Sequence, residues 1–222
     1  LAFAMALANG KTSLDLCPYV SDEAKEALAS AAAPPIRMVK VGTGENELEM
    51  GDETEIFRHD KRFNHPTVIA IEVKDNEDIE AKVEAINQLE FDHVGQHYEA
   101  NMVALVNASG DAATFKAAAE KAAAKTEKAF ALISDDLAAL EAALGVLADR
   151  KPLLYAANKD NFEKMTELAK ANNAALVVKG EDLDSLAELV EKVAAMDFRD
   201  IVLDPGSRET GKVLADMTQL RR

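Results

Sequence analysis

The sequence predicts an α/β fold in which parallel strands alternate with helices from residue 67 to residue 222. Short runs of Val, Ile, Leu and Ala recur, each followed by a polar junction and an amphipathic segment with helical spacing. The runs are almost continuously apolar, as is typical of parallel strands covered on both faces. The six expected strands are residues 68–73, 102–106, 130–133, 153–157, 175–178 and 201–203.

The segments between these strands have the spacing of helices. Apolar residues at intervals of three and four mark one helical face. They are Leu137, Leu140, Leu144 and Leu147 in one segment, and Leu183, Leu186, Val190 and Val193 in another. The expected N-caps are Asp135, Asn158 and Asp182, and Asn172 or Asn173 suits the end of its helix. Residues 111–129 are rich in Ala, Lys and Glu, which predicts a surface helix with a thin apolar face.

Strict alternation of strand and helix leaves two architectures, an open doubly wound sheet or an eight-stranded TIM barrel. The later strands begin at intervals that suit barrel units. Six βα units are visible, whereas a complete barrel takes about 250 residues. We therefore expect an incomplete TIM-barrel-like fold. Because the chain begins at Leu1 rather than Met and stops at Arg222 inside a predicted helix, we also expect a fragment of a longer protein.

The chain divides into three expected parts. Residues 1–35 are Ala-rich and helical, with Ser21 as a candidate N-cap, and Pro34 and Pro35 end the last helix. Residues 36–66 form a β-rich connector, with extended stretches at 36–41 and 55–63. Residues 67–222 are the partial barrel.

Composition excludes several functional classes. The chain has 222 residues with 40 acidic and 25 basic side chains, a formal charge of −15, so we expect no binding to nucleic acid. The apolar opening at residues 1–8 is too short to span a bilayer and has no preceding basic segment. A single cysteine cannot form an internal disulfide, in agreement with a reducing compartment. We expect a cytoplasmic protein without membrane association.

Candidate functional residues lie where parallel strands end, because such sheets place their working groups there. They are Asn107, Asp135, Asn158, Lys179 and Asp204. Asp135 and Asn158 are also ordinary helix caps, and Asp204 opens an Asp-Pro-Gly turn that needs no ligand to explain it. A Lys at a strand tip such as Lys179 can form a Schiff base, but only where it is desolvated.

The histidines and the cysteine each have two interpretations. His93 and His97 are four residues apart, like a zinc-binding pair, yet the intervening segment contains Gly95 and lacks a catalytic Glu, so polar loop histidines are favoured. Cys17 precedes Pro18, and a Cys-Pro pair closes many iron-sulfur cysteine motifs. A free cysteine packed as a small apolar side chain is the alternative. The sequence contains no Gly-rich phosphate loop, nucleophile elbow or paired-carboxylate motif.

Several segments carry a resemblance to a known family. These are residues 1–5, Gly10-Lys11, Cys17-Pro18-Tyr19-Val20-Ser21, Ala33-Pro34-Pro35-Ile36, the stretch 57–63 with Asn64 and Pro66, and Asp204-Pro205-Gly206. In this order they resemble the large subunit of the corrinoid iron-sulfur proteins, the gamma subunit of the acetyl-CoA decarbonylase/synthase complex.

The resemblance implies a [4Fe-4S] domain, a TIM barrel and a C-terminal corrinoid domain. Cys17 matches the fourth cluster cysteine, and the first three lie upstream of Leu1 in the family. The implied function is methyl transfer from a methyltetrahydropterin through the corrinoid cobalt to acetyl-CoA synthase, in the reductive acetyl-CoA (Wood-Ljungdahl) pathway. The implied partners are the small (delta) subunit, as a heterodimer, and acetyl-CoA synthase. We expect this chain alone to bind no cofactor and to be inactive.

Two other functions remain open from the residues. The first is an autonomous pterin-binding barrel methyltransferase that uses the strand-tip groups Asn107, Asn158 and Asp204. The second is a structural scaffold that holds the cluster domain, the corrinoid domain and a second subunit together without binding a small molecule.

Overall fold

The computed structural model describes residue 21, residues 37–51 and residues 65–220. The chain divides into two compact units, one of Leu1–Met38 with Gly51–Thr67 and one of Val39–Met50 with Val68–Arg222. Most of the first unit lies outside the described residues. The expected helices of residues 1–35 and the extended stretch 55–63 therefore lie outside them as well.

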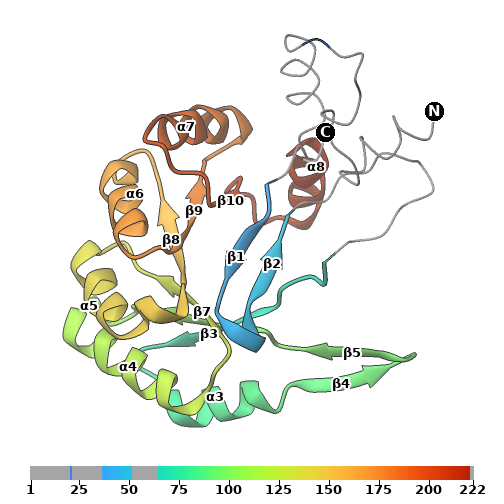
Figure 1. Cartoon of the computed structure of the whole chain (residues 1–222), viewed down its shortest axis with the longest axis vertical. Helices are drawn as coiled ribbons and strands as arrows, with labels where there is room; N and C mark the ends of the chain where they lie inside the picture. Colours follow the sequence, from blue (N-terminus) through green and yellow to red (C-terminus); the bar gives the residue numbers. More distant parts are fainter. Residues whose placement is uncertain (1–20, 22–36, 52–64, 221–222) are drawn as a thin grey trace. The chain divides into compact units, whose positions relative to one another are not determined.

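The second unit is built on a parallel sheet of six strands, as the alternating pattern predicts (Figure 1). The strands are neighbours in the order in which they occur in the chain, so no crossover reverses the order. They are β3 (Ala70–Lys74), β6 (Met102–Val106), β7 (Ala129–Ile133), β8 (Leu153–Ala157), β9 (Ala175–Lys179) and β10 (Ile201–Asp204). The expected α/β class and the six expected strands are thus confirmed.

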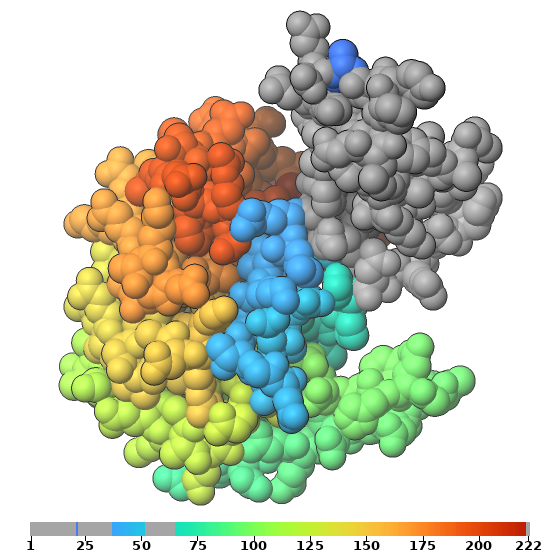
Figure 2. Space-filling view, in the orientation of Figure 1, coloured from blue at the N-terminus to red at the C-terminus, as the bar shows by residue number. Residues whose placement is uncertain are grey.

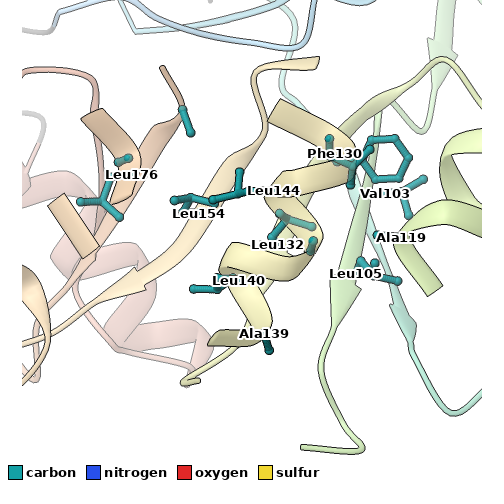
Figure 3. Packing of buried hydrophobic residues seen from close by; sticks show 14 of the residues in the cluster. Val103, Leu105, Ala119, Phe130, Leu132, Ala139, Leu140, Leu144, Leu154 and Leu176 are labelled. Carbon is teal, nitrogen blue, oxygen red and sulfur yellow. The ribbon is translucent and has the colours of Figure 1, made fainter. Parts of the chain in front are cut away.

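A helix follows each strand of this sheet in the chain, and all of these helices except the last cover one face of it. The helices are α3 (Ile79–Asn87), α4 (Ala112–Lys125), α5 (Leu137–Leu147), α6 (Phe162–Ala171), α7 (Leu183–Ala195) and α8 (Thr210–Leu220), and the 3-10 turn η3 (Ala148–Arg150) extends α5. Figure 3 shows the core beneath α4 and α5, where Leu140 and Leu144 point toward strand residues such as Leu132 and Leu154. These four leucines are almost completely buried, so this core contributes much of the favourable free energy of folding.

A short hairpin covers the opposite face of the sheet. It consists of β1 (Val39–Val41) and β2 (Leu48–Met50), with the 3-10 turn η2 (Gly44–Asn46) between them. Val39 and Val41 are buried in a second core together with residues of β6, β7 and β9 such as Val177. The amide of Gly42 donates a hydrogen bond to the carbonyl of Lys151, 3.0 Å away. Since Lys151 precedes β8, the turn of the hairpin lies near the amino ends of the strands.

A second hairpin is not predicted by the sequence. It consists of β4 (Glu90–His93) and β5 (Gln96–Glu99), and it lies between α3 and β6 in the chain. The interpretation of His93 and His97 as loop histidines was therefore wrong, because both lie on its strands. Val94 and Gly95 form the turn with positive φ angles of 50° and 75°. Two-residue turns of this kind match the twist of the flanking strands, so they favour a tight hairpin.

The expected helix ends are confirmed in part. Asp182 caps α7, and Asn172 ends α6. The N-cap of α5 is Asp136 rather than Asp135, and the N-cap position of α6 is Asn161 rather than Asn158. In both places a short polar loop separates strand from helix, so the first polar residue after the strand is not the cap.

The apolar face of α4 is thin, as expected, yet it is fully buried. Among the described helices, none is long and apolar enough to cross a membrane.

Candidate functional site

Three polar side chains of neighbouring strands lie on the face of the sheet that the β1–β2 hairpin covers, toward the carboxyl ends of the strands. Tyr155 of β8 packs against the second core. Lys179 and Asp204 each lie two residues beyond a core-facing valine on β9 or β10, so strand periodicity places them on the same face. The carboxyl ends of parallel strands are the usual position of functional sites in α/β proteins.

Tyr155, Asp204 and Arg208 form a closed hydrogen-bond network. The Tyr155 hydroxyl donates to Asp204 Oδ2 over 2.6 Å. The Arg208 guanidinium donates through Nη1 to Asp204 Oδ1 at 3.0 Å and through Nη2 to Asp204 Oδ2 at 2.8 Å. Arg208 Nη2 also donates to the Tyr155 hydroxyl at 2.8 Å. Bidentate pairs of this kind fix orientation as well as charge, so the network holds the loop after β10 against β8.

The same network determines the ionisation of its members. Burial alone would raise the pKa of the Asp204 carboxyl, but hydrogen bonds from Arg208, Tyr155 and the Gly206 amide outweigh burial and lower it to about 2. Burial, followed by the hydrogen bond to Asp204, raises the pKa of Tyr155 to about 12. The Asp204 carboxylate raises the pKa of Arg208. Around neutral pH, Asp204 is therefore anionic and Tyr155 is neutral, and neither suits a general acid or base.

A glycine allows the loop after β10 to approach the loop after β9. Gly206 has a φ of 77°, and a Cβ atom at this position would collide with the carbonyl oxygen of Gly180. The backbone also joins the two loops, since the Gly180 amide donates to the Asp204 carbonyl over 2.9 Å. Asp204 is also the register partner of Lys179 in the pairing of β10 with β9, so the two residues lie side by side.

Lys179 links this network to a surface cavity. Its ammonium lies 5.7 Å from the centre of the Tyr155 ring, in the range of a cation–π contact. In the part of the chain that the structure describes, no carboxylate lies within ion-pair distance of Lys179.

The cavity beside Lys179 has a volume of about 530 Å³ and is lined by side chains of both charges. Its lining includes Asn158, Lys159, Lys179, Ser185, Glu188 and Lys192. Lys179 is exposed, so the desolvation that a Schiff-base lysine needs is absent.

The other predicted strand-tip residues lie apart from this network and are used within their own loops. Asn107 donates to Ser134 Oγ over 3.0 Å and accepts from the Gly110 amide over 3.0 Å. Asn158 accepts from the amides of Asp160 and Asn161, so it organises the turn that starts α6. Both asparagine side chains therefore bind the backbone of their own loops, and neither is the N-cap of the helix that follows.

Sequence reasoning identified Asp204 and Lys179 but missed two members of the network. Tyr155 is the single polar side chain in the apolar strand β8, and this was the signal that could have revealed it. Arg208 follows Asp204 by four residues, but the intervening Pro and Gly exclude a helix, so spacing gave no indication of the contact. Asp75 was also missed. It is buried at the end of β3 and accepts from the amides of Ala108 and Ser109.

The described residues contain no cluster of three or more His, Cys, Asp or Glu that could hold a metal ion. His97 instead lies 2.9 Å from Asp92 and 3.7 Å from Glu90 across the β4–β5 hairpin. Cys17, the predicted cluster ligand, lies outside the described residues.

Comparisons with known proteins identify the family. The family described as CO dehydrogenase/acetyl-CoA synthase delta subunit matches residues 38–222, so the chain belongs to it. The corrinoid/iron-sulfur protein large subunit of Moorella thermoacetica is 57% identical over 225 residues, which cover 100% of this chain and 50% of that protein.

More distant relatives are acetyl-CoA decarbonylase/synthase gamma subunits. That of Methanothermobacter thermautotrophicus is 33% identical, over 97% of this chain and 48% of its own length. The gamma 2 subunit of Methanosarcina mazei is 38% identical with the same coverage. The resemblance seen in the sequence is thereby confirmed. The chain spans about half the length of these curated relatives.

Proposed function

We propose that this chain is part of the large subunit of a corrinoid iron-sulfur protein, which carries a methyl group from a methyltetrahydropterin to acetyl-CoA synthase in the reductive acetyl-CoA pathway. The observation that carries the proposal is the 57% identity to the Moorella large subunit across all of this chain. We place the protein in the cytoplasm, with the delta subunit and acetyl-CoA synthase as its partners.

Within that protein, the described unit supplies a rigid framework. The polar groups at its strand tips bind one another, since Asp204 is held by Tyr155 and Arg208 and the asparagines organise their own loops. None of these groups is set to exchange protons near neutral pH. This supports a scaffold in preference to an autonomous pterin-binding methyltransferase that uses Asn107, Asn158 and Asp204.

We further propose that residues 67–222 form part of a TIM barrel, after a cluster-domain segment at 1–35 and a connector at 36–66. Two features support the barrel over a doubly wound sheet. The strand order follows the chain without reversal, whereas a doubly wound sheet reverses at a switch point. The helices α3 to α7 all pack in one core, and the β1–β2 hairpin occupies the other face.

Cys17 is proposed as one ligand of a [4Fe-4S] cluster. Such a cluster requires four cysteine thiolates, and this chain contains one cysteine. The residues present therefore do not suffice to hold the cluster, and three further thiolates must come from outside these 222 residues. The corrinoid likewise belongs to the full-length protein in this proposal.

The test uses the full-length protein, purified without oxygen together with the delta subunit. We expect it to accept a labelled methyl group from methyltetrahydropterin and pass it to acetyl-CoA synthase, and we expect the 222-residue chain alone to accept none. In the full-length protein, Cys17→Ala is expected to remove or convert the cluster EPR signal without changing the far-UV circular dichroism. An unchanged four-iron spectrum would make Cys17 a packing residue. Methyl acceptance or a thermal shift with methyltetrahydropterin by the 222-residue chain alone would instead support an autonomous methyltransferase.

A further inference from the structure

The β4–β5 hairpin extends away from the body of its unit. Figure 1 shows its two strands projecting beyond the sheet and helices, and in Figure 2 the same green segment forms an arm of the surface. Its base is fixed by a hydrogen bond of 3.0 Å from the Ala100 amide to the Leu89 carbonyl. An ion pair of 2.7 Å between Lys128 and Glu99 also holds the base, and the Lys128 side chain is only 14% exposed. An isolated two-stranded hairpin is marginally stable in water, so a projecting one needs such anchors.

The hairpin exposes an unusual amount of apolar surface. Phe91 and Tyr98 face each other across the strands, and their rings stack with centres 5.4 Å apart at an angle of 18°. Phe91 is nevertheless 64% exposed, Tyr98 39% and Val94 87%, and Leu89 at the base is 51% exposed. The described part of the chain has eight exposed large apolar residues, and these four all belong to this one hairpin. Contiguous exposed apolar surface of this kind marks interaction sites.

Val94, at the tip of the hairpin, lowers the stability of the unbound protein. Val94 has a φ of 50°, in the left-handed region that β-branched residues rarely adopt. Asn-Gly is the preferred pair for this turn, so Val-Gly sacrifices local stability. An exposed valine in a strained position gains nothing within the folded unit, whereas an apolar partner surface would bury it.

The opposite face of the hairpin is acidic. Strand alternation places Glu90, Asp92, His97 and Glu99 together on the face away from the stacked rings. His97 lies between the carboxylates of Asp92 and Glu90, and Lys128 neutralises Glu99 at the base. The hairpin therefore presents an exposed valine at its tip, one face on which the stacked rings lie beside His93 and Gln96, and an opposite face that is net negative.

We propose that the β4–β5 hairpin is a docking element that inserts Val94 and the stacked Phe91–Tyr98 pair into an apolar groove of another protein subunit, with basic side chains at the rim of that groove. This rests on the proposed function, since it takes the partner to be the delta subunit of the same complex. A second copy of this chain fits less well. The chain carries a net charge of −15, so a second copy would meet the acidic face of the hairpin with like charge.

The test measures binding of this chain to purified delta subunit by isothermal titration calorimetry. Phe91→Ser combined with Tyr98→Ser is expected to weaken binding about tenfold or more, because central aromatic anchors dominate interface energetics. Tyr98→Phe keeps the stacked pair and serves as the matched control, with binding within about twofold of wild type. Higher salt is expected to weaken binding by the wild-type chain.

Val94→Asn separates docking from folding. Asn suits the left-handed turn, so this variant is expected to keep or raise the thermal midpoint while it weakens binding to the delta subunit. Equal affinity of wild type, Val94→Asn and the double serine variant would overturn the proposal, as would no binding of the wild-type chain to the delta subunit. In either case, methyl transfer by the full-length protein would leave the proposed function standing. Loss of methyl transfer with hairpin-dependent binding intact would refute the function and leave the docking surface.

Discussion

The Asp204 carboxylate joins two strands and the loop after β10. It receives hydrogen bonds from Tyr155 on β8 and from Arg208 and the Gly206 amide in its own loop. The Asp204 side chain is 14% exposed, whereas that of Arg208 is 61% exposed. The buried end of the pair is therefore satisfied by several donors, and the charge of Arg208 remains in contact with solvent. This arrangement avoids the cost of burying both ions.

The lowered pKa of Asp204 predicts acid-dependent stability. Because the folded pKa is about 2 and an unfolded Asp has a pKa of about 3.9, the carboxylate stabilises the fold above about pH 4. That contribution is lost as the pH falls from about 4 to about 2. Thermal unfolding of Asp204→Asn should show a lower midpoint than wild type at pH 7, and the difference should shrink toward pH 2. A difference that stays constant over this pH range would disprove the linkage.

Gly206 gives a second prediction at the residue scale. Gly206→Ala places a methyl group against the Gly180 carbonyl and forces Ala into a positive φ, so we expect a loss of about 1–3 kcal/mol in the free energy of unfolding. The control is Gly145→Ala within α5, where a Cβ atom would meet nothing within 4 Å. That variant should gain about 0.5–1 kcal/mol. Urea denaturation measures both, and a neutral Gly206→Ala would show that the two loops separate easily.

At the scale of elements, the spacing of apolar residues in the sequence predicted the positions of the sheet strands and their helices well. The strands of the sheet coincide with continuous apolar runs, and helix α7 begins at the predicted cap because its capping box is local in sequence. The β4–β5 hairpin was missed because its strands contain charged residues and histidines and bury almost nothing. Strands are predicted from the alternation of apolar and polar residues, which arises because one face is buried. An exposed hairpin therefore shows little of this alternation in its sequence.

The capping box of α7 can be tested directly. Asp182 accepts from the Ser185 amide over 2.9 Å, and the Ser185 hydroxyl accepts from the Asp182 amide over 3.1 Å. Asp182→Ala should cost about 1 kcal/mol in the free energy of unfolding. Asp184→Ala removes a charge from the same first turn without removing the cap, and it should cost only a few tenths of a kcal/mol. Equal losses in urea titrations would mean that charge, and not the cap, sets the stability of this turn.

At the scale of the whole molecule, the sequence predicted the alternation of strands and helices, and the spacing of the later strands favoured an incomplete TIM-barrel-like fold over a doubly wound sheet. The choice depends on which face each helix covers, and covered strands are apolar on both faces in either architecture. In the described residues, six parallel strands have one core beneath the helices and another beneath the β1–β2 hairpin, an arrangement compatible with the proposed barrel. The strand-tip network was only partly foreseeable for the same reason, since the contact between Tyr155 and Asp204 spans 49 residues of sequence and depends on strand order.

The proposed barrel makes a prediction about the outer strand β10 and the helix that follows it. Leu203 is 40% exposed, and Leu214 and Met217 on α8 are 70% and 45% exposed. Relatives are about twice as long as this chain, and further βα units after α8 would cover these side chains. Hydroxyl-radical footprinting should therefore find them reactive in the 222-residue chain and protected in the full-length protein.

Phe91 on the β4–β5 hairpin is the internal control for this comparison. Phe91 is 64% exposed, and its hairpin follows β3, the strand at the opposite end of the sheet from β10. We therefore expect Phe91 to stay reactive in the full-length protein without its partner. It should become protected when the delta subunit is added. Equal reactivity of Leu203, Leu214 and Met217 in both proteins would mean that the sheet ends at β10, which would contradict a barrel. Protection of these three residues in the full-length protein, with Phe91 still reactive, would support closure of the barrel within one chain. Protection of Phe91 only after the delta subunit is added would support docking between chains. The two results are independent because the two surfaces belong to different elements.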